Sequence, residues 1–139
     1  MIVVFHQNNK VVEVDNQGER KSFSRDNIAR TLYEIANDYQ DSLIVWCHIE
    51  LKSNLNREDF DEVFHHHKIM ASYNAEEKSF LSEAIGYVED SPFLKINKKT
   101  SYPTWQMSSY VGGVHASVLN VLKDKIAIDQ NFDYFLNSF

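Results

Sequence analysis

The segment from Thr104 to Leu119, TWQMSSYVGGVHASVL, gathers side chains of the kinds that line sugar-binding sites. Trp105 offers a flat ring on which a sugar can stack, while the amide of Gln106 and the hydroxyl of Ser108 can bond its hydroxyl groups. His115 is expected one turn into the helix that follows. Packing of the tryptophan together with ordinary surface polarity explains the same pattern equally well, so both interpretations stay open.

Two adjacent glycines, Gly112 and Gly113, precede an apolar segment of helical character. A helix that begins near Val114 leaves the backbone N–H groups of its first turn unpaired, and glycine lets an anionic group or a sugar hydroxyl approach them closely. The alternative is steric, because glycine also permits a tight turn or close packing against a sheet. We expect the packing role for Gly112 and ligand approach for Gly113.

A second candidate position is the end of the apolar run LIVWC, which His48 and Glu50 follow. In open parallel sheets the ligand crevice lies beyond the carboxyl ends of the strands, so this is a favoured place for binding residues. Alternation along an extended chain puts both side chains on one face. A simpler role, in which His48 only bonds a loop carbonyl, fits the same pattern.

A carboxylate pair, Glu89 and Asp90, ends the segment YVED at another expected junction between a strand and a loop. Carboxylate oxygens suit Mg²⁺ or Mn²⁺, and such an ion could carry the diphosphate of a ligand. A solvated turn before Pro92 is the commoner meaning of two adjacent acids. The pair is therefore a candidate metal site with a plain alternative.

Three adjacent histidines, residues 65–67, also suggest a metal at first sight. Adjacent side chains point in three directions, however, whereas zinc ligands come from separated positions or from positions i and i+4 of a helix. We expect them at a corner between a helix and a strand, where an imidazolium favours the helix C-terminus.

The elements that must position these residues are clearest in the first half of the chain. Residues 1–6 and 11–14 predict a short hairpin around an Asn-Asn turn, and Ser24 is the expected N-cap of a three-turn amphipathic helix. Residues 43–47 are continuously apolar, which predicts a central strand buried on both faces. A short helix over 57–64 and a strand over 68–72 complete an α/β alternation.

The second half is less regular. We expect a surface helix over 76–84, short strands over 85–88 and 93–96, and a helix over 114–122. No repeat or linker interrupts the chain, so residues 1–139 are expected to form a single α/β domain with a mixed, largely parallel sheet and flanking helices.

Composition narrows the classes of function. The formal net charge of −6 disfavours nucleic acid as a partner, and no apolar run reaches the roughly 18–20 residues of a membrane span. The lone Cys47 and the lack of a signal peptide favour the cytoplasm. The closing run NFDYFLNSF is unusually apolar for a terminus, so we expect this chain to be the N-terminal portion of a longer protein whose remainder packs on it.

The runs MIVVFH, LIVWCHIEL, HHKIMASYN, IGYVEDSPF and YPTWQMSSYVGGVHASVL together resemble the N-terminal region of bacterial family-2 glycosyltransferases of flavobacterial type. The resemblance spans nearly the whole chain, and the segment from the tryptophan to the double glycine is its most specific part. It implies a three-layer, Rossmann-like GT-A fold that binds a nucleotide-sugar at the strand ends, usually with a divalent cation such as Mg²⁺ or Mn²⁺.

The same resemblance implies roles for individual residues. It places Trp105 to Gly113 on the side of a carbohydrate acceptor and Glu89 and Asp90 near the metal, with the nucleotide-sugar crevice completed by the loop from His48 to Glu50. The expected function is thus glycosyl transfer from a nucleotide-sugar to an acceptor, or the GT-A-like domain of such an enzyme. The alternative is a non-catalytic module that docks the remainder of its polypeptide.

Overall fold

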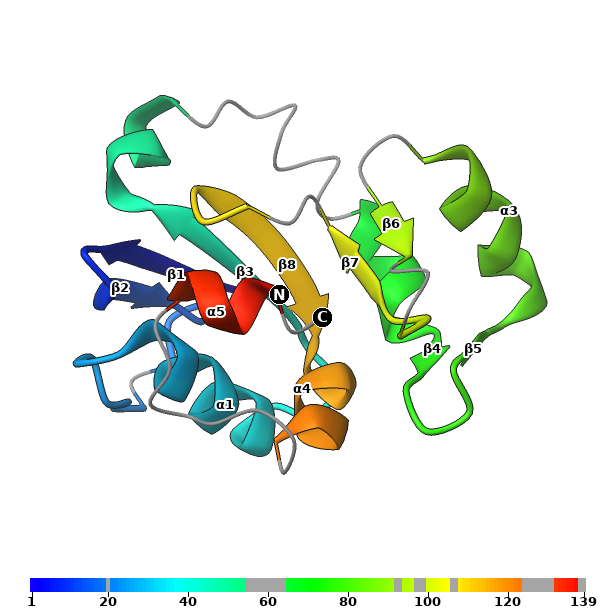
Figure 1. The fold of residues 1–139 in the computed structure, drawn as a ribbon, viewed down its shortest axis with the longest axis horizontal. Helices are drawn as coiled ribbons and strands as arrows, with labels where there is room; N and C mark the ends of the chain where they lie inside the picture. The colour runs from blue at the N-terminus through cyan, green and yellow to red at the C-terminus, as the bar shows by residue number, and fades with distance from the viewer. Residues whose placement is uncertain are drawn as a thin grey trace.

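The computed structural model of this chain shows a mixed α/β domain built on a six-stranded sheet (Figure 1). The structure describes residues 1–19, 21–54, 65–91, 94–96, 100–105, 108–123 and 132–137. The strands of the sheet, in spatial order, are β2 (Lys10–Asp15), β1 (Ile2–Gln7), β3 (Leu43–His48), β8 (Val111–His115), β7 (Pro103–Trp105) and β6 (Leu94–Ile96). The strands β4 (Tyr73–Asn74) and β5 (Ser79–Phe80) form a separate two-stranded sheet.

Helices cover this framework on two sides. The described helices are α1 (Ile28–Asp38), α3 (Ser82–Asp90), α4 (Ala116–Leu122) and α5 (Phe132–Leu136), with a further helical stretch over residues 65–71 and the 3₁₀-helix η1 (Ile49–Asn54). In Figure 1, α1, α4 and α5 are neighbours, whereas α3 lies apart from them beyond β6 and β7. No helix in the described part of the chain is long and apolar enough to cross a membrane.

The strand directions correct the expectation of a largely parallel sheet. Among the described strands β1 and β3 are the parallel pair, while β1–β2, β3–β8, β8–β7 and β7–β6 are antiparallel. The α/β class is thus confirmed, and a largely parallel Rossmann-like sheet is not. Parallel neighbours need a helical crossover between them, whereas antiparallel neighbours do not. The second half of the chain adds its strands without such crossovers, so these strands pair antiparallel.

The expected central strand is confirmed. All five residues of the run LIVWC are buried in β3, which lies between β1 and β8. Trp46 belongs to an apolar cluster with residues of α1, α4 and α5, and Val45 to a second cluster with Met70 and Val88. Because successive side chains of a strand point to opposite faces, both faces of β3 are covered. Cys47 is buried as well, which raises the pKa of its thiol to about 11 and keeps it protonated.

The N-terminal hairpin is also confirmed. Asn8 and Asn9 both have positive φ angles, 53° and 63°, as the two central residues of a type I′ turn require. Asparagine tolerates this left-handed region better than most residues do. The pairing of β1 with β2 shifts register between Phe5 and His6, so the strand is irregular at the point where it reaches the turn.

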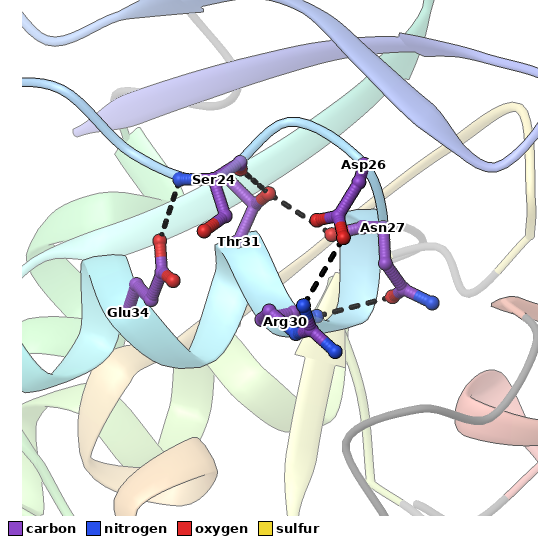
Figure 2. A network of polar contacts seen from close by, with 6 residues as sticks. All are labelled: Ser24, Asp26, Asn27, Arg30, Thr31 and Glu34. Carbon is purple, nitrogen blue, oxygen red and sulfur yellow. Dashed lines mark hydrogen bonds and ion pairs between the residues drawn. The ribbon is translucent and has the colours of Figure 1, made fainter.

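Helix α1 begins three residues later than the sequence predicts. Asn27, not Ser24, is the N-cap, and its side-chain oxygen accepts from the backbone N–H of Arg30 at 3.2 Å (Figure 2). The hydroxyl of Thr31 donates to the carbonyl oxygens of both Ser24 and Asn27. Ser24 thus supplies a carbonyl acceptor to the network around the helix start rather than a side-chain cap.

Several expected elements after η1 are wrong, including one expected in the first half of the chain. Residues 68–71 are helical rather than a strand, residues 85–88 lie within α3 rather than in a strand, and the expected helix over 76–84 is largely the β4–β5 turn and β5. A short apolar run does not by itself distinguish a strand from a buried helix. These segments carry no other local pattern that would have decided between the two. The strand expected at 93–96 is confirmed in outline as β6, whereas the helix expected over 57–64 lies outside the described residues.

The apolar residues near the end of the chain pack within this domain. Phe132 and Phe135 of α5 are buried, and their rings contact Trp46 and Tyr33, respectively. The two aromatic rings therefore pack in the core of this domain, and this packing explains why the segment is apolar. A longer parent protein stays a prediction.

Candidate functional site

The carboxyl ends of the parallel strands β1 and β3 form the first candidate site. The register of the two strands pairs His6, the penultimate residue of β1, with His48, the last residue of β3, so the two histidines are neighbours at the same end of the sheet. A pocket of about 320 Å³ opens there, which lies within the range of small-molecule sites. We call it the histidine crevice; its lining residues are His6, Asn8, Asn9, His48, Ser109, Tyr110 and Phe132.

His6 is the most buried polar group of the crevice. Its side chain is 4% exposed, and its Nε2 atom has no hydrogen-bond partner among the described residues. The ring packs edge-on against Phe132 at a centroid distance of 5.1 Å and against His48 at 5.5 Å. Burial, helped by nearby His48 and opposed by the backbone of Ser109, lowers the pKa of His6 to about 4. The ring is therefore neutral at pH 7.

His48 is oriented by its own loop. Its Nδ1 accepts from the backbone N–H of Glu50 at 3.2 Å, and its backbone N–H donates to the carbonyl of Tyr110 at 2.7 Å. An accepting Nδ1 places the proton of a neutral imidazole on Nε2, which leaves one ring N–H to serve as a donor. The structure thus differs from the simpler expectation that His48 donates to a loop carbonyl.

The hairpin turn completes the polar lining. The side-chain Oδ1 of Asn9 is buried and has no hydrogen-bond partner among the described residues, while the carbonyl of Asn9 accepts from Ile28 at the start of α1. Both the Oδ1 of Asn9 and the Nε2 of His6 are closed off from solvent, so a ligand in the crevice would meet the partly exposed polar residues His48 and Ser109 instead. The rings of Tyr110 and Phe132 add flat apolar surface.

The charge of the crevice restricts what it can hold. None of its described lining side chains is a lysine, an arginine or an acid, and the carboxylate of Glu50 is exposed with its Oε2 3.9 Å from the Nδ1 of His48. An isolated phosphate would find no cation here. The arrangement suits a neutral planar or hydroxylated group, such as a nucleobase, a ribose or a sugar.

The pH dependence of stability follows from the buried neutral His6. Its folded-state pKa of about 4 lies below the ordinary value of 6.5, so the unfolded chain binds the proton first as the pH falls. The stability that neutral His6 contributes is present above about pH 6.5 and is lost between there and pH 4, at up to about 1.4 kcal/mol per pH unit. We expect His6→Phe, which keeps a ring but cannot titrate, to lose less stability than the parent between pH 7.5 and pH 5.

Urea unfolding at the two pH values measures this difference. His67 and His115 also have pKa values lowered first by burial, and both remain in the variant, so subtraction isolates His6. Equal losses in the parent and in His6→Phe would show that His6 is not a buried neutral group.

The other expected site residues do not gather in the histidine crevice. Trp105 lies in β7 and belongs to the apolar cluster on the face of β3 opposite Trp46. His115 pairs with Leu43 at the other end of β3, because β8 runs antiparallel to that strand. Ser108 is close to the crevice, where its carbonyl accepts from the indole of Trp46 at 2.7 Å. Gln106 lies outside the described residues.

The two glycines are strand residues, which corrects the expected helix start. Gly112 and Gly113 are buried in β8, where they pair with Trp46 and Val45, respectively, and α4 begins only at Ala116. A Cβ added to Gly113 would lie 3.2 Å from the carbonyl oxygen of Ile44. Close approach of neighbouring strands therefore explains this glycine, and its N–H is not at a helix N-terminus.

The carboxylate pair lies away from the strand ends. Glu89 and Asp90 are exposed at the end of α3, which overturns the junction of strand and loop that favoured a metal there. Among the described residues, no three histidine, cysteine, aspartate or glutamate side chains come together as a metal site. A divalent cation at this pair therefore stays a prediction of the resemblance, and we derive no step through an ion.

Two signals in the sequence were missed. The runs VVFH and VWCH both end in histidine, and this shared pattern at two strand ends pointed to His6 as well as to His48. The segment Asp59-Phe60-Asp61 has the spacing of the Asp-x-Asp motif that a resemblance to GT-A enzymes makes relevant. These two acids lie outside the described residues.

Comparison with known proteins gives this chain no family. No protein-family model matches it, and neither a curated protein nor a solved structure does. The class of protein that the fold and the site define is therefore a mixed α/β domain with a neutral polar crevice at the ends of its parallel strands.

Proposed function

We propose that this domain binds a nucleotide-sugar in the histidine crevice and forms the GT-A-like, donor-binding part of a glycosyltransferase. The observation that carries the proposal is the meeting of His6 and His48 at the carboxyl ends of the one described parallel pair. In α/β sheets this is where ligands bind. The parallel pairing of β1 with β3, which β2 and α1 separate in the chain, supports the proposal.

The lining of the crevice indicates which part of the donor it would hold. Its uncharged side chains suit the base, the ribose or the sugar, and the diphosphate would extend beyond them toward solvent or toward another part of the protein. The reaction would join the sugar to a hydroxyl of a carbohydrate acceptor and release the nucleoside diphosphate. The carbohydrate acceptor and the divalent cation are predictions from the resemblance, and no catalytic residue is assigned.

Calorimetric titration of the 139-residue chain with UDP-glucose and GDP-mannose, each with and without Mn²⁺, tests the proposal. We expect His48→Phe to weaken binding at least about fivefold, because the partly exposed ring of His48 can bond a ligand and one hydrogen bond contributes roughly 1 kcal/mol, while the ring packing is kept. The matched control is His65→Phe, a histidine exposed outside the crevice. Failure of both donors to bind, or equal affinity of the parent and His48→Phe, would contradict donor binding in this crevice.

A non-catalytic docking module is the second candidate, and a specific observation favours it. Large apolar side chains are exposed beside and on α3 and on the edge strand β6, namely Leu81 at 59%, Ile85 at 45%, Tyr87 at 55% and Ile96 at 46%. Exposed apolar side chains that gather in one region indicate a protein interface. In this alternative the surface packs against the remainder of the same polypeptide. Absence of donor binding, together with tight association of a separately expressed C-terminal portion, would support it.

A further inference from the structure

Helix α5 packs on a histidine that is sealed from solvent. In Figure 1, α5 crosses in front of the sheet, and the ring of its Phe132 lies 5.1 Å from that of His6 and 5.7 Å from that of Trp46. His6 is 4% exposed, and its Nε2 has no hydrogen-bond partner among the described residues. The interface between α5 and the sheet therefore encloses a titratable group that water does not reach.

The sealed nitrogen of His6 is the one that must take up a proton. The ring has a hydrogen bond with the backbone of Ser109, and this bond favours the charged form of the ring. Because Nε2 has no partner, the bond belongs to Nδ1, which donates in it. Neutral His6 thus carries its proton on Nδ1. A second proton goes to Nε2, where the docked structure offers it neither an acceptor nor water.

The surroundings of His6 supply no counter-charge. The described groups around it are, by element, Asn8 and Asn9 of the hairpin turn, Val11 of β2, His48 of β3, Ser109 and Tyr110 before β8, and Phe132 of α5. Of these, His48 and Tyr110 are titratable and none is a carboxylate. The exposed carboxylate of Glu50 lies 3.9 Å from the Nδ1 of His48 rather than beside His6. A protonated His6 is therefore poorly accommodated while α5 is docked.

Helix α5 is the neighbour of His6 that can move without breaking the sheet. Strand β1, which carries His6, is paired on one side with β2 and on the other with β3. By contrast, α5 has five residues, and a helix of that length is not stable by itself in water. Its described contacts are the packing of apolar side chains, and the rings of Phe132 and Phe135 stack on each other at 5.9 Å. The two rings can therefore leave together.

A second polar atom at this interface lacks a partner. Tyr33 of α1 contacts the ring of Phe135 edge-on at 5.8 Å, and its hydroxyl is buried without a hydrogen-bond partner among the described residues. Burial raises the pKa of Tyr33 to about 12, so this hydroxyl is neutral in acid and at pH 7 alike. Ring packing thus holds α5 in place and two sealed polar groups oppose it. Of these two groups, His6 is the one that responds to acid.

We propose that α5 is an acid-released cover, which undocks from β1, β3 and α1 when the Nε2 of His6 takes up a proton, while the six-stranded sheet stays folded. Undocking lets water reach His6 and removes Phe132 from the wall of the histidine crevice. The proposal does not rest on donor binding in the crevice, because it concerns the docking of α5 alone.

The expected size of the effect follows from proton linkage. In the released state His6 is hydrated and its pKa is near the ordinary 6.5, whereas burial lowers the pKa of docked His6 to about 4. Proton uptake therefore favours the released state as the pH falls through 6.5, and the gain levels off near pH 4. The ratio of released to docked α5 should rise roughly a hundredfold between pH 7 and pH 4.

The two tryptophans of the chain report on the two faces of the sheet. Trp46 contacts Phe132, whereas Trp105 belongs to the apolar cluster on the opposite face. ¹⁹F NMR of the 139-residue chain labelled with 5-fluorotryptophan, with signals assigned by Trp105→Phe, follows both residues during an acid titration. We expect the Trp46 signal to change between pH 6.5 and pH 4 while the Trp105 signal and the far-UV circular dichroism stay native. No change at Trp46, or simultaneous changes at both tryptophans, would overturn the proposal.

His6→Phe tests whether His6 drives the release. This variant keeps a ring against Phe132 but cannot titrate, so its Trp46 signal should stay constant from pH 7 to pH 4. The control is His65→Phe, since His65 is exposed and its ring contacts Tyr87 instead; it should show the same transition as the parent. A transition that persists in His6→Phe would overturn the proposal.

Phe132→Ala tests the cover from the other side of the interface. Loss of this ring weakens the docking of α5, so the Trp46 signal should already have its acid position at pH 7, with the Trp105 signal native. This variant changes α5 rather than the sheet, so it remains informative if His6→Phe folds poorly. A Trp46 signal in Phe132→Ala with the pH dependence of the parent would overturn the proposal.

Discussion

Trp46→Ala should lower the free energy of unfolding by about 3–5 kcal/mol, the typical cost of removing a fully buried tryptophan. The indole is completely buried in β3, packs edge-on against Phe132 at 5.7 Å, and donates from Nε1 to the carbonyl of Ser108 at 2.7 Å. Its loss leaves a large cavity between the sheet and α5, together with an unpaired carbonyl. Chemical denaturation followed by circular dichroism measures the change.

Two further variants separate burial from chemistry at this position. Trp46→Phe keeps much of the ring and loses the hydrogen bond to Ser108, so its cost should be smaller. Tyr87→Ala removes an aromatic side chain that is 55% exposed, and it should cost well under 1 kcal/mol. If Trp46→Ala costs no more than Tyr87→Ala, the placement of β3 at the centre of the sheet is wrong.

Gly113→Val should destabilise the fold by roughly 1–3 kcal/mol, as overpacking of a tight interior does. Even a Cβ at this position would lie 3.2 Å from the carbonyl oxygen of Ile44, 3.4 Å from the ring of Trp105 and 3.4 Å from Val45. A branched side chain adds two methyl groups to that space. We expect ligand affinity per folded molecule to stay unchanged, because this glycine packs strands and does not line the histidine crevice.

A control comes from a glycine that lies in a helix and has open space around it. Gly86 lies in α3, and an added Cβ there meets nothing within 4 Å. Gly86→Ala should therefore stabilise the protein by up to about 1 kcal/mol through helix propensity. Thermal unfolding of Gly113→Val, Gly113→Ala and Gly86→Ala makes the comparison. A loss of donor affinity in Gly113→Val without a loss of stability would restore the ligand role that the sequence suggested.

The first half of the fold was predictable because its signals are local. The Asn-Asn turn, the amphipathic spacing of α1 and the continuous apolar run of β3 each specify an element within a few neighbouring residues. The second half has short apolar runs whose helical or extended state depends on distant partners. Gly113 is the clearest case. A side chain at this position would crowd the backbone of Ile44 and the ring of Trp105, and both lie far from Gly113 or out of its local sequence pattern until the strands pair.

The residues of the candidate site were likewise predictable only where the signal in the sequence is local. The buried run LIVWC predicts the position of His48 at the end of β3, whereas the run that forms β1 gives no local reason to single out His6. Its importance depends on the β1–β3 register, which pairs it with His48. His115 is expected one turn into a helix, but it is the last residue of β8 and the N-cap of α4, because the apolar segment after the glycines begins as a strand that runs antiparallel to β3.

The pairing of β3 with β8 has a consequence for how this protein reaches its native state. Residues 43–47 bond residues 111–115, so the chain between them must close a long loop before β8 can add to the sheet. Contacts of high sequence separation slow folding, whereas the β1–β2 hairpin and its packing on α1 involve nearby residues. The histidine crevice needs Ser109 and Tyr110, which lie just before β8. We therefore expect the crevice to form only after β8 has docked, so that ligand capture there follows the formation of the hairpin.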